Sequence, residues 1–557
     1  MKIPGCEILV RTLIEQGVDV MFGYPGGQVL NIYDKLYDHQ KEIRHVITAH
    51  EQAAAHAADG YARATGKVGV CIATSGPGAT NLTTGLATAY LDSVPVVAIT
   101  GNVAMSQIGR DSFQEVDITG ITMPITKYNY FVSDVTKLAD TIREAFRIAK
   151  SGRPGPVLID IPTSTQKAVC DYEPQKPVEK DPPLLPDPVD IAIAAKMINE
   201  AENPVIYIGG GVITSDASKE VLELSELIDA PISSSLMGLS AISSDNPRFL
   251  GMQGMHGHFA SSMAVANADL IIALGSRFSD RATGAKEKYS VKAKKIHIDV
   301  DDAEIDKNIS VDCGIQADIK ESLKVLLTMA EKKSHPDWQA KIEYYKDEEK
   351  KLSDNMPGLT PYNVINVVNE VKSDDTPVAT DVGQHQMWAA QYLDLKKQRT
   401  FLTSGGLGTM GYGMGASIGA SIATGLRTIL ITGDGSFGMN LNEIQTAVYH
   451  HIPLTVLIMN NGVLGMVRQW QTLFYNKHYS STVLDRATDY VKLADAFGAK
   501  GHKCTSIEDL KNVLEEAQKS DDVWIIDCPI DKDEFVLPML PPGGSMDDII
   551  TRKDGLI

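Results

Sequence analysis

Short apolar runs alternate with stretches of helical period along most of the chain. Thr428 to Thr432 and Leu454 to Met459 are apolar runs of strand length, and the side chains between them recur at helical spacing, at Leu441, Ile444, Gln445 and Val448. Runs that are apolar on both faces are typical of strands buried in a parallel sheet. Three regions of the chain share this alternation, which predicts an α/β fold.

Breaks in the alternation divide the chain. A charged, proline-rich stretch from Val169 to Val189 indicates a stiff linker, and prolines and glycine end a charged helical stretch at Glu331 to Leu352. We therefore expect domains at 1–168, 189–335 and 360–530, then an irregular tail at 531–557 laid over the surface or over a site. The first and third regions share the order strand, glycine loop, helix, strand, which suggests one topology for both.

The clearest candidate chemistry lies at two strand ends. Gly433-Asp434-Gly435 follows one strand, and Asn460-Asn461 ends the next. Because ligands of open parallel sheets bind at the carboxyl ends of strands, we expect Asp434, exposed by the turn, and Asn461 to meet there. Their oxygens suit Mg²⁺, which leaves its other positions to phosphate. In residue type, spacing and strand context the pattern resembles the thiamine diphosphate signature.

Composition and charge narrow the class of partner. The net charge is −19, from 52 Lys and Arg against 71 Asp and Glu, which argues against a nucleic-acid-binding surface. Six scattered cysteines without a C-x-x-C pair suggest neither a disulfide framework nor a zinc site. No apolar run approaches the roughly 18 residues that span a bilayer, and the first residues lack signal character. We therefore expect a cytoplasmic protein that binds neither nucleic acid nor membrane.

Glu51 ends a short strand and opens an alanine-rich helix. A carboxylate favoured by the helix dipole is the ordinary explanation of such a position. Its small apolar neighbours predict burial instead, which would raise the carboxyl pKa and keep a proton available. His50 and His56 lie six residues apart and lack the H-E-x-x-H spacing, so they do not indicate zinc.

Two glycine loops have competing interpretations. Gly406-x-Gly408-x-x-Gly411 matches the dinucleotide fingerprint formally, but the acidic residue at the expected distance is Asp434, inside another motif. We interpret it as a loop that passes close to a ligand. Gly209-Gly210-Gly211 follows a strand and is as consistent with a phosphate loop as with a plain turn.

Two segments with larger side chains follow strand ends. Arg277 to Gly284 holds two arginines and an aspartate, which can pair with one another or bind an anion. Met466 and Trp470 share one helical face just after Asn461. Core packing is the usual explanation of such a pair, and the wall of a pocket is the alternative.

The motifs match one family along nearly the whole chain, from Gly23-Tyr24-Pro25-Gly26-Gly27 to Leu537-Pro-Met-Leu-Pro-Pro-Gly543. The chain resembles the catalytic large subunits of the acetohydroxyacid (acetolactate) synthase family. The resemblance implies three doubly wound parallel-sheet domains, which bind the thiamine pyrimidine, FAD and the diphosphate in that order. It also implies a homodimer or homotetramer whose active sites are built across two chains, and it leaves open a small regulatory subunit.

The resemblance also assigns residues to roles. Glu51 is implied to bond the aminopyrimidine ring of thiamine diphosphate, and Met410 to hold the cofactor in its bent form. Mg²⁺ is implied to bind Asp434, Asn461 and the Val463 carbonyl. The other implied cofactor positions are Tyr24, Pro25, Gly26, Gly27, Gln384, His385, Gly433, Gly435, Ser436 and Met466. The implied FAD positions are Gly209, Gly210, Gly211, Asp299 and Asp318. The implied substrate-binding residues are Phe113, Gln114, Val467 and Trp470, with Arg277 near the second keto acid and FAD.

The implied reaction is the decarboxylation of pyruvate and the transfer of its hydroxyethyl unit to a second pyruvate or 2-ketobutyrate. The products are 2-acetolactate and 2-aceto-2-hydroxybutyrate, in the first common step of branched-chain amino acid biosynthesis. An FAD-dependent pyruvate oxidase and a catabolic acetolactate synthase without FAD are the alternatives within the superfamily. A nicotinamide dehydrogenase and a non-catalytic binding protein are more distant, and Glu51, Asp434 and Asn461 argue against the latter.

The chain departs from the family pattern at three places. Thr163-Ser164 stands where the family often has Lys-Asp, so that lysine's role is not carried over. Asp301-Asp302 replaces the usual Asp-Pro, and Arg277-Phe-Ser-Asp replaces Arg-Phe-Asp-Asp. The FAD expectation therefore rests on a weaker match than the thiamine one.

Overall fold

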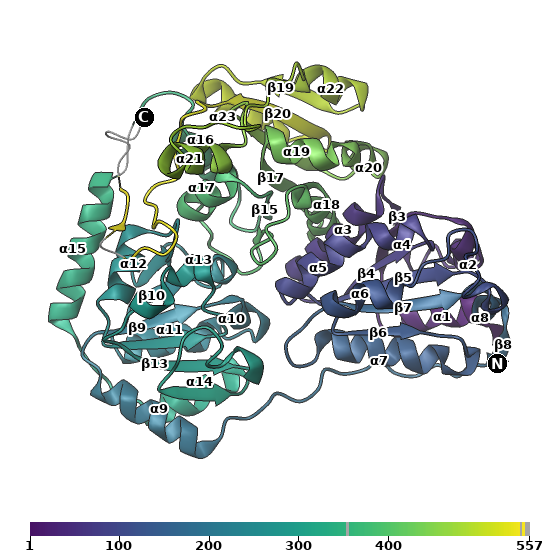
Figure 1. Ribbon diagram of the computed structural model, residues 1–557, viewed down its shortest axis with the longest axis horizontal. Helices are drawn as coiled ribbons and strands as arrows, with labels where there is room; N and C mark the ends of the chain where they lie inside the picture. Colours follow the sequence, from purple (N-terminus) through teal and green to yellow (C-terminus); the bar gives the residue numbers. More distant parts are fainter. Residues whose placement is uncertain (353–355, 546–547, 552–557) are drawn as a thin grey trace.

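The computed structural model describes residues 1–352, 356–545 and 548–551. They form three α/β units, each built around a six-stranded parallel sheet with helices on both faces (Figure 1). The inner strands, such as β5 (Val96–Asn102), β12 (Leu270–Leu274) and β17 (Thr428–Gly433), are buried on both faces, which explains their continuous apolar runs. The predicted class, three doubly wound parallel-sheet domains, is confirmed.

The first sheet has the order β3-β2-β4-β5-β7-β6. Its strands are β2 (Val20–Gly23), β3 (Arg44–Ile47), β4 (Gly69–Ala73), β5 (Val96–Asn102), β6 (Tyr128–Phe131) and β7 (Val157–Pro162). One face packs against α1 (Gly5–Glu15), α2 (Leu30–Asp38) and α7 (Leu138–Lys150). The other packs against α3 (Glu51–Thr65), α4 (Pro77–Asn81), α5 (Thr83–Leu91) and α6 (Ile118–Thr122). An antiparallel pair, β1 (Lys2–Pro4) and β8 (Val169–Asp171), and α8 (Thr163–Lys167) complete the unit.

The third sheet has the order β16-β15-β17-β18-β20-β19. Its strands are β15 (Val378–Thr380), β16 (Phe401–Leu402), β17 (Thr428–Gly433), β18 (Leu454–Asn460), β19 (Lys500–Lys503) and β20 (Val523–Pro529). One face packs against α18 (Tyr412–Thr424), α19 (Asp434–Asn440), α20 (Ile444–Tyr449) and α22 (Tyr490–Ala496). The other packs against α16 (Pro361–Val371), α17 (Gln384–Tyr392), α21 (Gly465–Phe474) and α23 (Ile507–Gln518). Counted along the chain, the first and third sheets have the same strand order.

The central sheet has a different order, β11-β10-β9-β12-β13-β14. Its strands are β9 (Pro204–Ile208), β10 (Ile232–Ser234), β11 (Phe249–Met252), β12 (Leu270–Leu274), β13 (Lys294–Asp299) and β14 (Cys313–Gln316). One face packs against α9 (Pro188–Glu200), α10 (Gly210–Thr214), α11 (Ser218–Leu227) and α14 (Ile319–Met329). The other packs against α12 (Phe259–Ala266) and α15 (Pro336–Leu352), and α13 (Asp280–Thr283) lies near the C-terminal ends of the strands. This is the strand order of dinucleotide-binding folds.

A shared core joins the first and third units through α3 and α18. Small residues let the two helix backbones approach closely. A Cβ on Gly60 of α3 would overlap the Ala416 carbonyl, and a Cβ on Gly419 of α18 would overlap the Ala57 carbonyl. The two units are therefore held in one fixed orientation within the chain.

The segments between and after the units lie on their surfaces. The linker follows the lower edge in Figure 1, and Asp181 in it pairs with Arg147 of α7 at 2.8 Å. The tail after β20 runs from the third unit to the central one. Asp533 pairs with Arg468 of α21 at 2.7 Å, and the Leu540 amide donates to the Met255 carbonyl at 2.8 Å. Among the described residues, the helices are too short or too polar to span a membrane.

One predicted helix is broken. Instead of continuing through Leu441 to Val448, the chain ends α19 at Asn440, makes a 3-10 turn at Leu441–Glu443 and then enters α20. Asn440 donates to the Gly411 carbonyl at 2.6 Å, and Glu443 accepts a bond from the Ala49 amide at 3.1 Å. These contacts to other elements outweigh continuous helix geometry.

Candidate active site

Asp434 stands where β17 turns into α19. Its side chain is only 5% exposed, so the expectation of an exposed carboxylate was wrong. The Leu464 and Leu484 side chains lie close over Gly435 and cover the turn. Burial raises the pKa of Asp434 to about 6, although the Asn461 amide donates to its carboxylate. A carboxylate in this setting gains most from a bound cation, which favours its charged form.

Asn461 follows β18, the neighbour of β17. Gly433 and Met459 are paired in the sheet, so the two strand ends lie side by side, as predicted. The Asn461 side chain is oriented from both sides: Oδ1 accepts a bond from the Val463 amide, and Nδ2 donates to Gln384 Oε1, each at 3.2 Å. Two kinds of hard oxygen, a carboxylate and an amide, therefore meet at this edge of the sheet.

His385 lies directly beside the Gly-Asp-Gly turn. A Cβ on Gly433 would lie 2.9 Å from its Nδ1, so only glycine leaves room for the ring. Burial lowers the pKa of His385 to about 3, which makes the ring neutral. Its Nε2 is buried without a hydrogen-bond partner among the described residues. A buried ring nitrogen without a partner beside the turn indicates that a polar ligand binds here.

The glycine loop before α18 closes the same site from the other side. The Gly411 amide donates to Ser436 Oγ at 3.3 Å, and the methyl group of Met410 lies 3.9 Å from a Cβ placed on Gly435. At its other end, the loop amides of Gly405 and Gly406 donate to Asp92 at 3.0 and 2.7 Å. This loop binds a carboxylate of the chain itself, which agrees with the interpretation that it is no dinucleotide fingerprint.

Glu51 opens α3 in the first unit. Its carboxylate accepts a bond from Asn81 Nδ2 at 2.9 Å and faces Gly78, but the residue is partly exposed, so predicted burial was wrong. The reason is the loop over it, Gly76-Pro77-Gly78, which lacks long side chains. The segment from Tyr24 to Gly27, which includes Pro25, lies next to this loop, because Gly26 packs against Thr74.

Two segments supply apolar side chains to the edges of these sites. Phe113 is 85% exposed, and Gln114 adopts a φ of 61° against Gly76. On α21, Met466, Val467 and Trp470 line a cavity of about 700 Å³. The Arg281 guanidinium of the central unit lies 5.7 Å from the centre of the Trp470 ring.

The candidate FAD residues lie at the carboxyl edge of the central sheet. Gly209 and Gly211 are required by the close approach of the Gly275 turn, whereas a Cβ on Gly210 would only reach ordinary contact with Met237. Arg277 follows that turn, and its carbonyl accepts a bond from Asn308 at 3.0 Å.

Two acidic residues complete the candidate FAD set. Burial raises the pKa of Asp299 to about 6. Asp318 is the N-cap of α14, where it accepts a bond from the Glu321 amide at 3.1 Å, so capping already explains it.

Sequence reasoning assigned no role to Asn81 and Asp92, which hold these sites together, and it did not predict the contact of Arg281 with Trp470. Asn81 was visible as the only amide in the loop that faces Glu51. Asp92 and Arg281 act between units, and no local pattern could indicate their partners.

Comparison with known proteins adds independent findings. Residues 3–121 match the N-terminal TPP binding domain of thiamine pyrophosphate enzymes, 191–326 the central domain, and 381–528 the C-terminal TPP binding domain. The chain is therefore similar to these enzymes in all three units, in the same order.

Three curated relatives match almost end to end. A probable acetolactate synthase large subunit of Methanocaldococcus jannaschii is 45% identical over 98% of this chain and 95% of its own length. An acetolactate synthase of Mycobacterium bovis is 45% identical, over 98% and 91%. An acetolactate synthase large subunit of Corynebacterium glutamicum is 43% identical, over 98% and 90%. The chain belongs to the acetolactate synthase large-subunit family of thiamine pyrophosphate enzymes.

Proposed function

We propose that this acetolactate synthase decarboxylates pyruvate and transfers the hydroxyethyl unit to a second pyruvate or 2-ketobutyrate. The observation that carries the proposal is the meeting of Asp434, Asn461 and an unpartnered His385 nitrogen at two adjacent strand ends. A buried carboxylate, an amide oxygen and a buried ring nitrogen without a partner suit a polar ligand that carries a metal, such as a diphosphate. The near full-length likeness to acetolactate synthases supports the choice of reaction.

Mg²⁺ binds Asp434 Oδ, Asn461 Oδ1 and the Val463 carbonyl in this proposal. The hydrogen bond from Asn461 Nδ2 to Gln384 turns the amide so that its oxygen faces away from Gln384. Mg²⁺ takes few protein oxygens and fills its other positions with phosphate oxygens and water. The cation also offsets the raised pKa of Asp434, because it stabilises the carboxylate.

The diphosphate lies against the start of α19 and α17. The start of α17 would offer its oxygens the backbone amides of Gln384 and His385. The Gln384 side chain does not take part, because it already donates to Gln469 and to the Glu534 carbonyl. Gly433, Gly435 and Ser436 bring backbone amides and a hydroxyl to the same place. Met410 and Met466 support the cofactor on its apolar side.

Glu51 acts on the other end of the cofactor. Bound thiamine diphosphate supplies an electron sink for the carbanion chemistry. Glu51 would hydrogen bond to the aminopyrimidine ring, while Asn81 holds one carboxyl oxygen in place. Tyr24, Pro25, Gly26 and Gly27 form the wall beside the ring.

The keto acids bind between the apolar segments. Phe113, Gln114, Val467 and Trp470 surround the reacting carbons and exclude water, which favours loss of the pyruvate carboxylate. Arg277 binds the carboxylate of the second keto acid.

FAD binds the central unit, whose strand order supports this assignment. Gly210 follows the first strand and opens α10, a place that suits a diphosphate, and Gly209 and Gly211 allow the close approach of the Gly275 turn. Asp299 and Asp318 lie nearby, at a strand end and a helix start. The buried Asp299 suits a hydroxyl donor of the ligand.

The active site is completed by a second copy of the chain in a homodimer or homotetramer. Phe113 supports this proposal, because a site residue that is 85% exposed in one chain gains burial from a partner. The names of relatives as large subunits support a small regulatory subunit. The cysteines, none of which forms a disulfide in the described residues, support a cytoplasmic location.

The test is to assay the purified protein with pyruvate as sole substrate, thiamine diphosphate and Mg²⁺. We expect a yellow protein that forms 2-acetolactate without consuming oxygen or reducing a dye in proportion to product. Stoichiometric oxygen use would identify a pyruvate oxidase, and a colourless active enzyme would identify the catabolic type.

The shared site has its own test. Mixtures of inactive Glu51→Gln and Asp434→Ala chains regain part of the activity after subunit exchange. No recovery despite proven exchange would place the whole site within one chain.

A further inference from the structure

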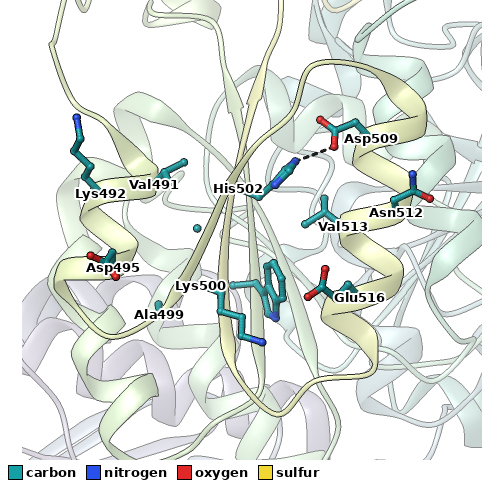
Figure 2. Close-up of a pocket in the computed structure, with 12 residues that line it drawn as sticks. Val491, Lys492, Asp495, Ala499, Lys500, His502, Asp509, Asn512, Val513 and Glu516 are labelled. Carbon is teal, nitrogen blue, oxygen red and sulfur yellow. Dashed lines mark hydrogen bonds and ion pairs between the residues drawn. The ribbon is translucent and has the colours of Figure 1, made fainter.

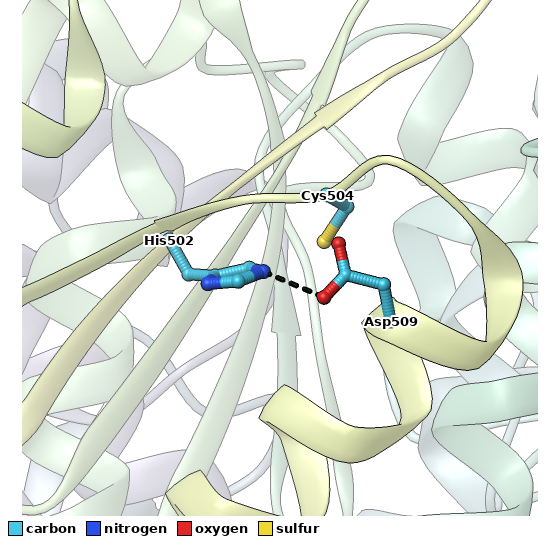
Figure 3. Close-up of side chains that lie close together, drawn as sticks. All are labelled: His502, Cys504 and Asp509. Atoms are coloured by element: carbon cyan, nitrogen blue, oxygen red, sulfur yellow. Dashed lines mark hydrogen bonds and ion pairs between the residues drawn. The ribbon is translucent and has the colours of Figure 1, made fainter.

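Three side chains that commonly bind metals lie together at the far edge of the third sheet, away from the proposed Mg²⁺ site. They are His502, Cys504 and Asp509, and one potential ligand atom from each lies within 4.8 Å of the others (Figure 3). His502 Nε2 and Asp509 Oδ1 are 2.9 Å apart. The group contains one nitrogen, one sulfur and one oxygen, the three donor types of zinc sites.

The turn between β19 and α23 creates this group. His502 and Cys504 are two residues apart along extended chain, so both side chains point to the same side. Ser506 then caps α23, and its hydroxyl accepts a bond from the Asp509 amide at 3.1 Å. The cap turns the first helical turn back over the strand end and brings Asp509 to the other two.

Further hydrogen bonds orient the ligands, as second-shell groups do in metal sites. Asp509 Oδ2 accepts bonds from the Thr505 amide at 2.8 Å and from its hydroxyl at 3.1 Å, which leaves Oδ1 directed at His502. The Cys504 thiol is hydrogen bonded to the Cys528 thiol on β20. An imidazole paired with a carboxylate would alone be an ordinary ion pair. The buried thiol, only 2% exposed, adds a third donor that such a pair does not need.

The site opens onto a groove. A cavity of about 720 Å³ lies between α22 and α23, and His502 and Asp509 line one end of it (Figure 2). Asp495 and Glu516 add negative charge to its walls, against Lys492 and Lys500. A cation bound by the three ligands is therefore reachable from solvent and keeps an open position for water.

We propose that His502 Nε2, Cys504 Sγ and an Asp509 carboxylate oxygen bind one divalent cation of the zinc type. Thiolate and imidazole donors favour such a metal over Mg²⁺, which prefers oxygen alone. β19 is separated from β18 by β20, so the site lies about 10 Å across the sheet from Asn461. Both sites lie beyond the carboxyl ends of their strands, and their donor atoms predict a different metal for each.

Cobalt(II) is the probe, because a thiolate bound to Co²⁺ gives a charge-transfer band in the near ultraviolet. The full-length protein is titrated with Co²⁺ in the presence of thiamine diphosphate and excess Mg²⁺. We expect one Co²⁺ per chain with this band, and displacement of Co²⁺ by Zn²⁺. Cys504→Ser abolishes the band, and His502→Gln weakens Co²⁺ binding more than about tenfold, the lower range for loss of a group that supports a metal.

Cys170→Ser is the matched control, since Cys170 is a partly exposed thiol of the first unit. It keeps the band and the stoichiometry. Acetolactate formation by each variant shows that it is folded, and the exposed His502 gives a second variant if Cys504→Ser is unstable. Absence of the band in the parent protein, or its persistence in Cys504→Ser or undiminished binding in His502→Gln, would overturn the proposal.

Discussion

The first and third units arrange six strands in the same order, yet the ends of equivalent strands carry different chemistry. The third strand of each sheet is followed by a tight turn, which begins with Thr74 in the first unit and Asp434 in the third. After the fourth strand, the first unit continues to Phe113 and Gln114, and the third to Asn461 and Trp470. The comparison teaches that one fold places different side chains at equivalent strand ends, and that the proposed metal site differs from its counterpart by a single carboxylate.

Substitution of the Asp434 carboxylate should have the largest effect on activity. Asp434→Ala removes a charged metal ligand, so we expect loss of thiamine diphosphate binding and more than a hundredfold loss of activity, beyond the 10–100-fold typical of outer-shell changes. Thr74→Ala at the equivalent position of the first unit is the control and keeps cofactor binding. The measurements are cofactor titration and initial rate. Full activity of Asp434→Ala at ordinary Mg²⁺ would contradict the assignment.

Substitution of Glu51 tests the part of the proposed site that lies in the first unit, where no metal ligand is proposed. In Glu51→Gln the cofactor still binds, because the diphosphate end is intact, but activation of the thiazolium proton slows by about 10²–10⁴-fold, the usual value of acid–base assistance. Proton exchange followed by NMR measures this step directly. A wild-type exchange rate would leave Glu51 a structural role only.

The packing of α3 against α18, which joins the first and third units, can be disrupted without changing a residue of the proposed active site. Gly419→Val places a side chain into the α3 backbone, and overpacking of this kind costs about 3 kcal/mol at the upper end of its range. Gly27→Ala, which meets nothing within 4 Å, is the control for stability. Calorimetry at a fixed scan rate should show a lower unfolding temperature for Gly419→Val alone. Equal unfolding temperatures would show that the helices can separate at little cost.

The pocket of the third unit should determine the choice of the second substrate. The two acceptors, pyruvate and 2-ketobutyrate, differ by one methylene, whose contact is worth about 1–3 kcal/mol. Trp470→Leu should therefore keep acetolactate formation and lose much of any preference for 2-ketobutyrate in a competition assay. Phe474→Leu, which changes a neighbour of the Trp470 ring, should keep the preference. An unchanged product ratio in Trp470→Leu would show that Trp470 serves core packing and does not select the substrate.

The smallest effect concerns pH. Asp434 has a raised pKa of about 6, so its carboxylate is charged above that value and binds a proton below it. Mg²⁺ affinity is therefore fully present above pH 6 and falls about tenfold per pH unit below it, because one proton competes with the metal. Glu51→Gln should show the same slope in calorimetric titrations. A slope that disappears in Glu51→Gln would assign the pH dependence to the first unit.

Much of this molecule follows from local sequence. Continuous apolar runs such as Leu454 to Met459 predicted the central strands, and glycine with hard-oxygen residues predicted the strand-end site. Exposure was predicted less well: Asp434 is buried by Leu464 and Leu484, and Glu51 is partly open. Both outcomes depend on loops that come from elsewhere in the chain.

Contacts between distant segments were invisible for a related reason. Cysteine spacing could not indicate the group of His502, Cys504 and Asp509, because such rules look for paired cysteines, whereas one turn brings these three side chains together. The Asp92 carboxylate that holds the Gly405 loop is more than 300 residues away in sequence. Packing of whole units decides such pairs, and no periodicity encodes it.

The tail has a consequence for how the enzyme is made. Residues 533–540 leave the ribosome after all three sheets, yet they carry the partners of Arg468 and Gln384 and the amide that reaches Met255. Because units fold in order during synthesis, α17 and α21 form before the tail residues that contact them are made. The site can therefore be completed only after the last residues are translated. In a nascent chain halted before this segment, the three units are folded, but α17 and α21 lack their contacts with the tail.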